Sequence, residues 1–307
     1  MGGDPIHDGL VLFAEFMGTG ARPETDAKSL RRWVHAHQKL LDPALDRPLN
    51  DWLQRVREAE DSRAAAALGA YVQLRRRCRD YGTDAAFDRQ AWAEENRDTD
   101  ELMSQLRAEA ARAQDTYSRT RTAFDAGEAA GLWVACSEAA SKVDAPWQIR
   151  ADFIISLSVM FLEMYRVTGN ESYSEDALSF LRKIVDVLPR TSGLRLNCLI
   201  NITVGWQDRF RADPALPVLD RALAAHEEVA SDYAGTGRTD ATVAVALGDR
   251  CRCRWTRYQL TNSMTDLRAA GRAQAAWLTL KPSIRPQDTA WQAELAAALA
   301  RHGFRPG

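Results

Sequence analysis

The sequence predicts an all-α fold that is built from repeated helix pairs in its second half. Apolar residues recur at spacings of three and four, and runs that alternate apolar and polar residues between turn signals are almost absent. A landmark also repeats, because three aromatic residues that close helical runs are each followed by an alanine twelve positions later: Tyr165 and Ala177, Phe210 and Ala222, and Tyr258 and Ala270. Repeat periods of this size are typical of stacked helix pairs.

The N-terminal region is expected to form four helices. Apolar periodicity predicts helices over about 8–17, 24–41 and 64–78. Another helix is expected to start near Pro48, with Asn50 as its N-cap, and Gly82 stands where the glycine of a helix C-cap belongs. We therefore expect an N-terminal helical domain over residues 1–82.

A polar stretch follows this domain. Residues 81–100 are poor in aliphatic side chains, so we expect a connector that carries at most one short helix around Trp92. An alanine-rich, charged sequence then predicts a long helix over about 98–121. The expected organisation is an N-terminal domain (1–82), a connector with a long helix (83–119) and a repeat region (120–307).

The repeat region is expected to hold about four helix pairs and a closing helix. The pairs that carry the aromatic and alanine landmarks are 147–167 with 173–188, 194–210 with 214–231, and 240–260 with 264–280. A weaker pair precedes them, in which Gly127 and Ala135 lie 42 positions before Gly169 and Ala177 and the second helix covers about 128–142. Residues 287–302 are expected to close the array, because its last repeat would otherwise expose an apolar face.

The segment from Tyr165 to Pro189, YRVTGNESYSEDALSFLRKIVDVLP, resembles the helix-turn-helix of the tetratricopeptide repeat, in particular its long-period actinobacterial type. The aromatic-x-x-Thr-Gly-Asn turn, the Ala-Leu of the second helix and the final proline carry the resemblance, and degenerate copies follow around Phe210 and Tyr258. The resemblance covers about residues 120–307. It implies an α-α superhelix whose first helices line a concave groove, and it names no ligand, because packing residues define the family.

Counting back from the three aromatic residues divides each first helix into two faces. A stripe of small and apolar residues, which includes Ala151, Leu196 and Cys251, is expected to lie in the core. A second stripe is polar, and the resemblance implies that it faces the groove. Its candidate ligand-contacting residues are Asp152, Asn197, Asn201, Asp208 and Asp249. A solvated helix face is the alternative interpretation.

Arginines form a second candidate set. Arg150 and Arg195 take the same position in the repeat frame, and Arg250, Arg254 and Arg257 form a stripe on the last first helix. Their planar guanidinium groups suit carboxylate or phosphate. With the nearby asparagines, they resemble in kind the carboxylate clamp that some tetratricopeptide proteins use on peptide C-termini. The alternative is that the stripe pairs with acids of a neighbouring helix, such as Asp266.

Signals for catalysis and metal binding are sparse. No serine or cysteine has a recognisable base partner, the five cysteines lack CxxC spacing, and His35 and His37 point about 200° apart on a helix. The cysteines are expected to be buried thiols. The arginine run of Arg75, Arg76 and Arg77 with Arg79 fans around the last turn of a helix, where the helix dipole favours cations. A class I terpene cyclase, another all-α type, is disfavoured because no Asp-Asp-x-x-Asp element exists. We therefore predict no catalytic residue, metal ligand or cofactor.

Composition limits the partner classes. A formal net charge of -2 and a pI near 6.2 give no electrostatic reason to expect nucleic acid or a membrane as a partner. The first residues do not read as a signal peptide, so a cytoplasmic location is expected. The leading hypothesis is a non-catalytic scaffold or regulatory protein that holds a partner protein segment or peptide in its concave groove. The alternative is an enzyme that acts on a small molecule of natural-product type, with its pocket between the N-terminal domain and the repeats.

Overall fold

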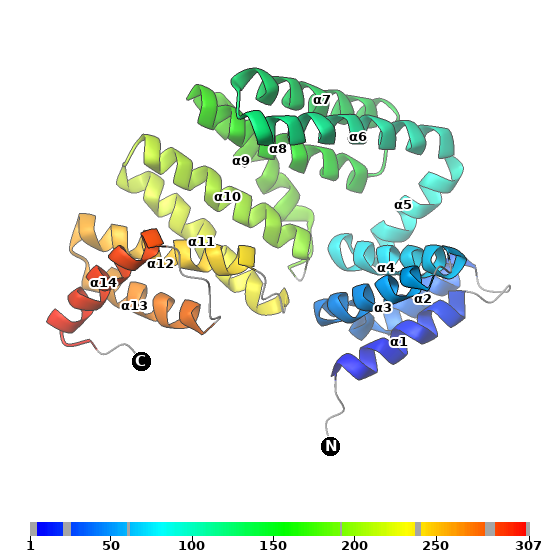
Figure 1. Cartoon of the computed structure of the whole chain (residues 1–307), viewed down its shortest axis with the longest axis horizontal. Coiled ribbons are helices and arrows are strands. Elements are labelled where there is room, and N and C mark those ends of the chain that lie inside the picture. The colour runs from blue at the N-terminus through cyan, green and yellow to red at the C-terminus, as the bar shows by residue number, and fades with distance from the viewer. Residues whose placement is uncertain are drawn as a thin grey trace. The chain divides into compact units, whose positions relative to one another are not determined.

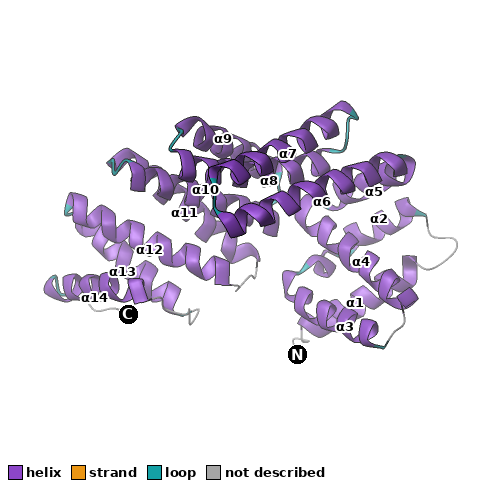
Figure 2. Cartoon of the chain, turned by 45° about the horizontal axis from the view of Figure 1, so that its top comes forward, coloured by secondary structure: helices purple, strands orange, loops and turns teal. Residues whose placement is uncertain are grey.

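A computed structural model describes residues 5–20, 26–59, 62–190, 192–236, 241–279 and 286–304. These residues form fourteen α-helices and two short 3-10 helices, and they contain no strand (Figures 1 and 2). The all-α class is therefore confirmed. The chain divides into a first unit, Met1–Met160 with Asp186–Arg195, and a second unit, Phe161–Val185 with Leu196–Gly307, which we describe separately. The domain boundaries expected at residues 82 and 119 both fall inside the first unit and stay a prediction.

The first unit begins with helices that differ from the predicted ones at their ends. The elements are α1 (Pro5–Gly20), α2 (Ala27–Ala36), η1 (Gln38–Leu41), η2 (Pro43–Leu45), α3 (Asp46–Glu58), α4 (Ser62–Tyr81) and α5 (Thr83–Glu95). The helix predicted over 24–41 is shorter, because the backbone at His37 leaves helical geometry (φ -123°, ψ 56°) before η1 starts. The prediction that Asn50 caps a helix is wrong. The turn η2 runs directly into α3 at Asp46, so Asn50 lies inside the helix.

The segment expected to be a polar connector holds the thirteen-residue helix α5, which is longer than predicted. Its start is tied to the end of α4 by Gly82, whose φ of 91° is open to glycine and strained for other residues. Gly82 therefore ends α4 as predicted and lets α5 begin at the next residue. Phe87 and Ala86 of α5 are buried in the core of the first unit, which explains why a polar-looking sequence forms a packed helix.

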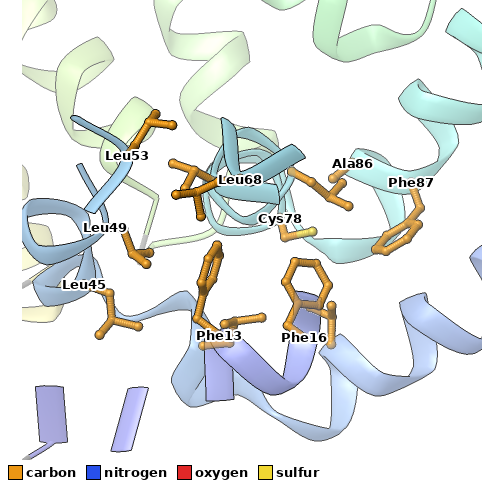
Figure 3. Close-up of a cluster of buried hydrophobic side chains, with 13 residues drawn as sticks. Phe13, Phe16, Leu45, Leu49, Leu53, Leu68, Cys78, Ala86 and Phe87 are labelled. Atoms are coloured by element: carbon orange, nitrogen blue, oxygen red, sulfur yellow. The ribbon is translucent and has the colours of Figure 1, made fainter. Parts of the chain in front are cut away.

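The core at the start of the first unit brings together apolar residues from helices α1 to α5 (Figure 3). Phe13 and Phe16 of α1 are fully buried, and they lie with Leu49 of α3, Cys78 of α4 and Phe87 of α5 in this core. Burying a side chain as large as phenylalanine or leucine contributes about 1.5–3 kcal/mol. This core is what fixes the end of α4, where a charged cluster lies.

Arg75 of α4 is fully buried in the same region. Its Nε donates to the carbonyl oxygen of Leu40 at 2.7 Å, Nη1 lies 2.6 Å from Asp46 Oδ1, and Nη2 donates to the carbonyl oxygen of Asp42. The interpretation that Arg75 lies in the last turn of a helix is wrong, because α4 continues to Tyr81 and only Arg79 of the run lies in its last turn. The guanidinium group of Arg75 donates to carbonyl oxygens of the 3-10 segment, where no α-helical turn supplies backbone donors.

Four helix pairs and a closing helix follow, as predicted (Figure 1). They are α6 (Arg97–Thr120) with α7 (Ala123–Lys142), α8 (Trp147–Thr168) with α9 (Glu171–Val187), α10 (Gly193–Ala212) with α11 (Leu216–Thr236), α12 (Ala241–Thr261) with α13 (Met264–Leu278), and finally α14 (Pro286–Arg301). Most ends agree with the predicted ranges within two or three residues.

The landmarks proposed for the weakest pair are wrong. Gly127 and Ala135 lie inside α7, and Ala135 is exposed. The turn before α7 lies at Arg121, where φ is 57° and the amide donates to the carbonyl oxygen of Tyr117 at 2.8 Å. Ala129 stands twelve residues after Tyr117 and is fully buried, so the aromatic and alanine landmark occurs in the first pair as well.

The turns of three pairs share one geometry. The amide four residues after the aromatic residue donates to its carbonyl oxygen in each, from Arg121 to Tyr117, from Gly169 to Tyr165 and from Asn262 to Tyr258. Each of these donor residues has positive φ. The pair of α10 and α11 departs from the pattern because Pro214 occupies the donor position and has no N–H. There the bond shifts by one residue, from Asp213 to Arg209 at 2.8 Å.

The alanine of each landmark lies at a fully buried position. Ala129, Ala177, Ala222 and Ala270 all have 0% exposure. A larger side chain at such a position would have to displace its neighbours, because protein interiors are close-packed. The repeated spacing is therefore a packing constraint, which agrees with a helical repeat.

Candidate functional site

The second unit carries the polar stripe that the sequence places on the first helices. On α10 the neighbouring core stripe is buried, with Leu196 at 0%, Ile200 at 8% and Thr203 at 2% exposure. On the polar stripe, Asn197 is exposed and Asn201 is half-buried. On α10 the two asparagines are therefore more accessible than the core stripe beside them.

Asp208, the last member of this stripe on α10, is buried at 8% exposure. Its Oδ2 lies 2.7 Å from Arg166 Nε of α8, and its other oxygen pairs with Arg211. The carboxylate therefore links α8 to the end of α10. A ligand would meet the arginines that surround Asp208 before it met Asp208 itself.

A cleft of about 430 Å³ opens beside Asp208, at the turn ends of the α8–α9 and α10–α11 pairs. It is open to solvent. Six of the ten residues that line it are charged, three basic and three acidic: Arg166, Arg209, Arg211, Glu171, Asp208 and Asp213. Their formal charges cancel, so the cleft suits a ligand that presents both signs of charge.

Ion pairs and a ring contact hold the arginines of the cleft. Arg209 lies 3.1 Å from Glu171 and 3.7 Å from Glu175, and its guanidinium carbon sits 5.4 Å from the centre of the Trp206 ring. Arg221 approaches the same indole to 5.0 Å. Contacts of this kind restrict the arginine side chains, which lowers the entropy that a ligand would have to remove on binding.

The arginine stripe on α12 is engaged in ion pairs with neighbouring helices. Arg250 lies 2.5 Å from Glu227 of α11, and Arg254 lies 2.7 Å from the same carboxylate. Burial alone would raise the pKa of Glu227, but hydrogen bonds from the two arginines lower it below its ordinary value. Arg254 also reaches Asp266 of α13 at 3.3 Å.

Arg257 completes this network. It pairs with Asp266 and lies 2.7 Å from Asp220 of α11. Asp266 is 1% exposed, and its backbone amide donates to the hydroxyl oxygen of Ser263, the N-cap of α13, at 3.4 Å. The network therefore alternates three arginines with three acids, and it matches the alternative in which the stripe pairs with acids such as Asp266. A carboxylate clamp made of Arg250 and Arg254 would require a ligand to displace these pairs.

The remaining candidates lie apart from this network. Asp249 is half-buried and lies 2.9 Å from Arg252 on its own helix. Three candidates belong to the first unit. Arg150 is half-buried, Asp152 accepts a hydrogen bond from the Tyr81 hydroxyl, and Arg195 Nη1 lies 3.5 Å from the carbonyl oxygen of Leu188. The nine candidate residues thus divide into three of the first unit and six of the second.

A buried polar cluster in the second unit was not predicted. His226 of α11 is 1% exposed, and its Nε2 lies 2.9 Å from Gln207 Nε2 of α10, which in turn lies 3.9 Å from the sulfur of Cys253 on α12. Burial, assisted by the charge of Arg250, lowers the pKa of His226 to about 4. Burial also raises the pKa of Cys253 to about 11. Gln207 in a core position of the repeat frame was the sequence signal that could have located the cluster.

The fold defines a class, an all-α protein made of helix pairs packed in sequence along the chain. No protein family, no curated protein and no solved structure matches the chain. Within the described ranges, no three His, Cys, Asp or Glu side chains converge as metal ligands would. No helix in the same ranges is long and apolar enough to cross a membrane.

Proposed function

We propose that the chain is a non-catalytic binding protein of the tetratricopeptide-like kind, which holds an extended segment of a partner protein on the second unit. The segment lies along the polar stripe of α10 and ends in the charged cleft. The turn geometry shared by three helix pairs and their buried landmark alanines support the tetratricopeptide-like assignment.

The cleft is the observation that carries this proposal. Pockets that bind small molecules are mostly apolar and largely enclosed, with few polar groups. This cleft is partly open, and six of the ten residues that line it are charged. Glu171 and Arg211 present side chains that are 66% and 61% exposed, so both can reach a partner without leaving their ion pairs. An open, charged surface of this kind favours a polypeptide segment over a small substrate.

The stripe and the cleft are close enough for one short segment to use both. Asn201 and Asp208 are two helical turns apart on α10, about 10 Å along the axis at 1.5 Å per residue. An extended chain of three residues covers this distance. Asparagine amides both donate and accept hydrogen bonds, which matches the unpaired backbone groups of an extended segment.

Selection from a random peptide display library on the purified full chain tests the proposal. Selected peptides are synthesised and their Kd is measured by fluorescence anisotropy. We expect Arg211→Glu, and separately the double change of Asn197→Ala with Asn201→Ala, to weaken binding at least tenfold, which is about 1.4 kcal/mol. Arg301→Glu, a charge reversal at an exposed position of α14, is the matched control and leaves Kd unchanged.

Two results would overturn the proposal. One is that the library yields no peptide whose binding saturates. The other is that selected peptides bind the cleft and stripe variants as tightly as the unchanged chain.

A further inference from the structure

The arginines of the charged cleft are each held by at least one acid. Arg166 pairs with Glu163 and with Asp208. Arg211 pairs with the other oxygen of Asp208, and Arg209 pairs with two acids of α9, as described above. The positive charges of the cleft are therefore already matched by negative ones.

Two acids of the same cleft keep carboxylate oxygens without a partner. Asp213, in the turn after α10, is exposed, and its carboxylate has no hydrogen bond or ion pair to any described residue. Glu171 is 66% exposed and pairs with Arg209 through Oε2, which leaves Oε1 without a partner in the part of the chain that the structure describes. Such oxygens can accept charge-assisted hydrogen bonds from a cation.

The surroundings of the cleft are acidic overall. Its lining carries three arginines and three acids, whose charges cancel. Ion pairs to the lining add Glu163 and Glu175, and Arg221 of α11 reaches the indole ring that Arg209 also contacts. Four arginines against five acids leave a formal charge of -1. The local charge therefore favours a cation over an anion.

Tyr165 adds a buried polar group to the cleft. It is 6% exposed and lines the cleft, and its hydroxyl group has no hydrogen bond to any of the described residues. Burial raises the pKa of this phenol; the charge of Arg209 opposes the rise, and the charges of the acids that line the cleft add to it. The hydroxyl group is therefore neutral at pH 7, and its oxygen can accept a hydrogen bond from a cation.

We propose that the partner segment inserts the side chain of one basic residue, a lysine or an arginine, into this cleft. Its charged end lies with Glu171, Asp213 and the Tyr165 hydroxyl, and its aliphatic stem packs on Val218, which lines the cleft and is half-buried. Arg211, whose side chain is 61% exposed, donates to backbone carbonyl oxygens of the same segment. The proposal rests on the binding role proposed above and specifies the chemistry of the partner.

Three peptide display libraries test the proposal on the full chain. The middle position of each decapeptide is fixed as lysine, methionine or glutamate, and the other positions are random mixtures of uncharged residues. We expect the best peptides of the lysine library to bind with a Kd at least tenfold lower than those of the other two, measured by fluorescence anisotropy. Replacing the fixed lysine by methionine, which keeps an unbranched apolar stem, is expected to raise the Kd at least tenfold.

Variants of the chain test whether the lysine lies in the cleft. The double change of Glu171→Gln with Asp213→Asn is expected to raise the Kd of the lysine peptide at least tenfold and that of its methionine analogue by less than about threefold. Tyr165→Phe is expected to raise the Kd of the lysine peptide alone, by about threefold. This change fits the repeat, because Phe210 occupies the equivalent position in the next pair. Glu294→Gln removes an exposed acid of α14 outside the cleft and is the matched control, which leaves both Kd values unchanged.

The outcomes separate this proposal from the binding role on which it rests. If no library yields a peptide whose binding saturates, both are wrong. If peptides bind but the lysine library has no advantage, the basic side chain is wrong and the binding role stands. The same conclusion follows if the double change weakens the lysine peptide and its methionine analogue equally.

Discussion

The buried imidazole of His226 predicts that the second unit loses stability in mild acid. Its pKa falls from an ordinary 6.5 to about 4 in the folded chain. As the pH falls, His226 therefore takes up a proton in the unfolded chain at a higher pH than in the folded chain. The folded state has the full stabilisation above pH 6.5 and loses it as the pH falls toward 4. Linkage gives a loss of about 2 kcal/mol at pH 5 and about 3 kcal/mol at pH 4, relative to pH 7.

A variant separates this loss from the titration of other groups. Arg250, Arg252 and Glu227 also act on His226, and the carboxylates of the second unit titrate over the same range. His226→Gln removes the titration and keeps a side chain that can bond to Gln207. The free energy of local opening of α11 is measured by native-state hydrogen exchange at pH 7 and at pH 5. We expect the decrease between these two pH values to be about 2 kcal/mol smaller in His226→Gln than in the unchanged chain.

The control and the refuting result are defined by the same measurement. His302→Gln removes an exposed imidazole of the second unit and is expected to follow the unchanged chain. Equal pH dependence of α11 exchange in the unchanged chain and in His226→Gln would refute the assignment of His226 as a buried neutral imidazole.

Two further predictions concern the stability of the helix pairs. Asp266→Asn is expected to lower the free energy of unfolding by about 2 kcal/mol, less than the 3–5 kcal/mol of a fully buried pair because Arg254 and Arg257 are partly exposed. Asp220→Asn, at a 47% exposed carboxylate, is the control and costs under about 1 kcal/mol by chemical denaturation. Gly248→Ala would place a methyl group 2.9 Å from the Trp277 ring and is expected to cost about 1–3 kcal/mol. Gly131→Ala is the control, because the added methyl group meets no atom within 4 Å, and it is expected to stabilise α7 by about 0.5–1 kcal/mol. If Gly248→Ala also stabilised the chain, the close approach of α12 and α13 at Gly248 would be contradicted.

The helix pairs were predictable because their landmarks are packing residues that recur. An alanine that must be fully buried cannot be replaced freely, and the aromatic residue twelve positions earlier marks the turn. The same spacing applied one pair earlier would have found Tyr117 and Ala129 in place of Gly127 and Ala135. Glycine was a poor guide there, because Arg121 adopts the positive φ of the turn.

The candidate site was predicted less well, because its properties depend on side chains of other helices. Spacing places Arg250 and Arg254 on one face, but it does not show that Glu227 and Asp266 meet them. Arg77 and Arg75 are two residues apart in one arginine run, and only the surrounding helices distinguish the bonded Arg75 from Arg77, which has no ion pair to any described residue. Which arginine is available to a ligand is therefore a property of tertiary structure.

The bonds of Arg75 have a consequence for the order in which the first unit folds during synthesis. The carbonyl oxygens of Leu40 and Asp42 accept hydrogen bonds from the guanidinium group of Arg75, which lies 35 and 33 residues further along the chain. Until α4 has left the ribosome, the segment between α2 and α3 lacks the donor that satisfies these two carbonyl oxygens. We therefore expect a nascent chain that ends before Arg75 to protect α2 and α3 poorly against proteolysis, and one that extends past α5 to protect them fully.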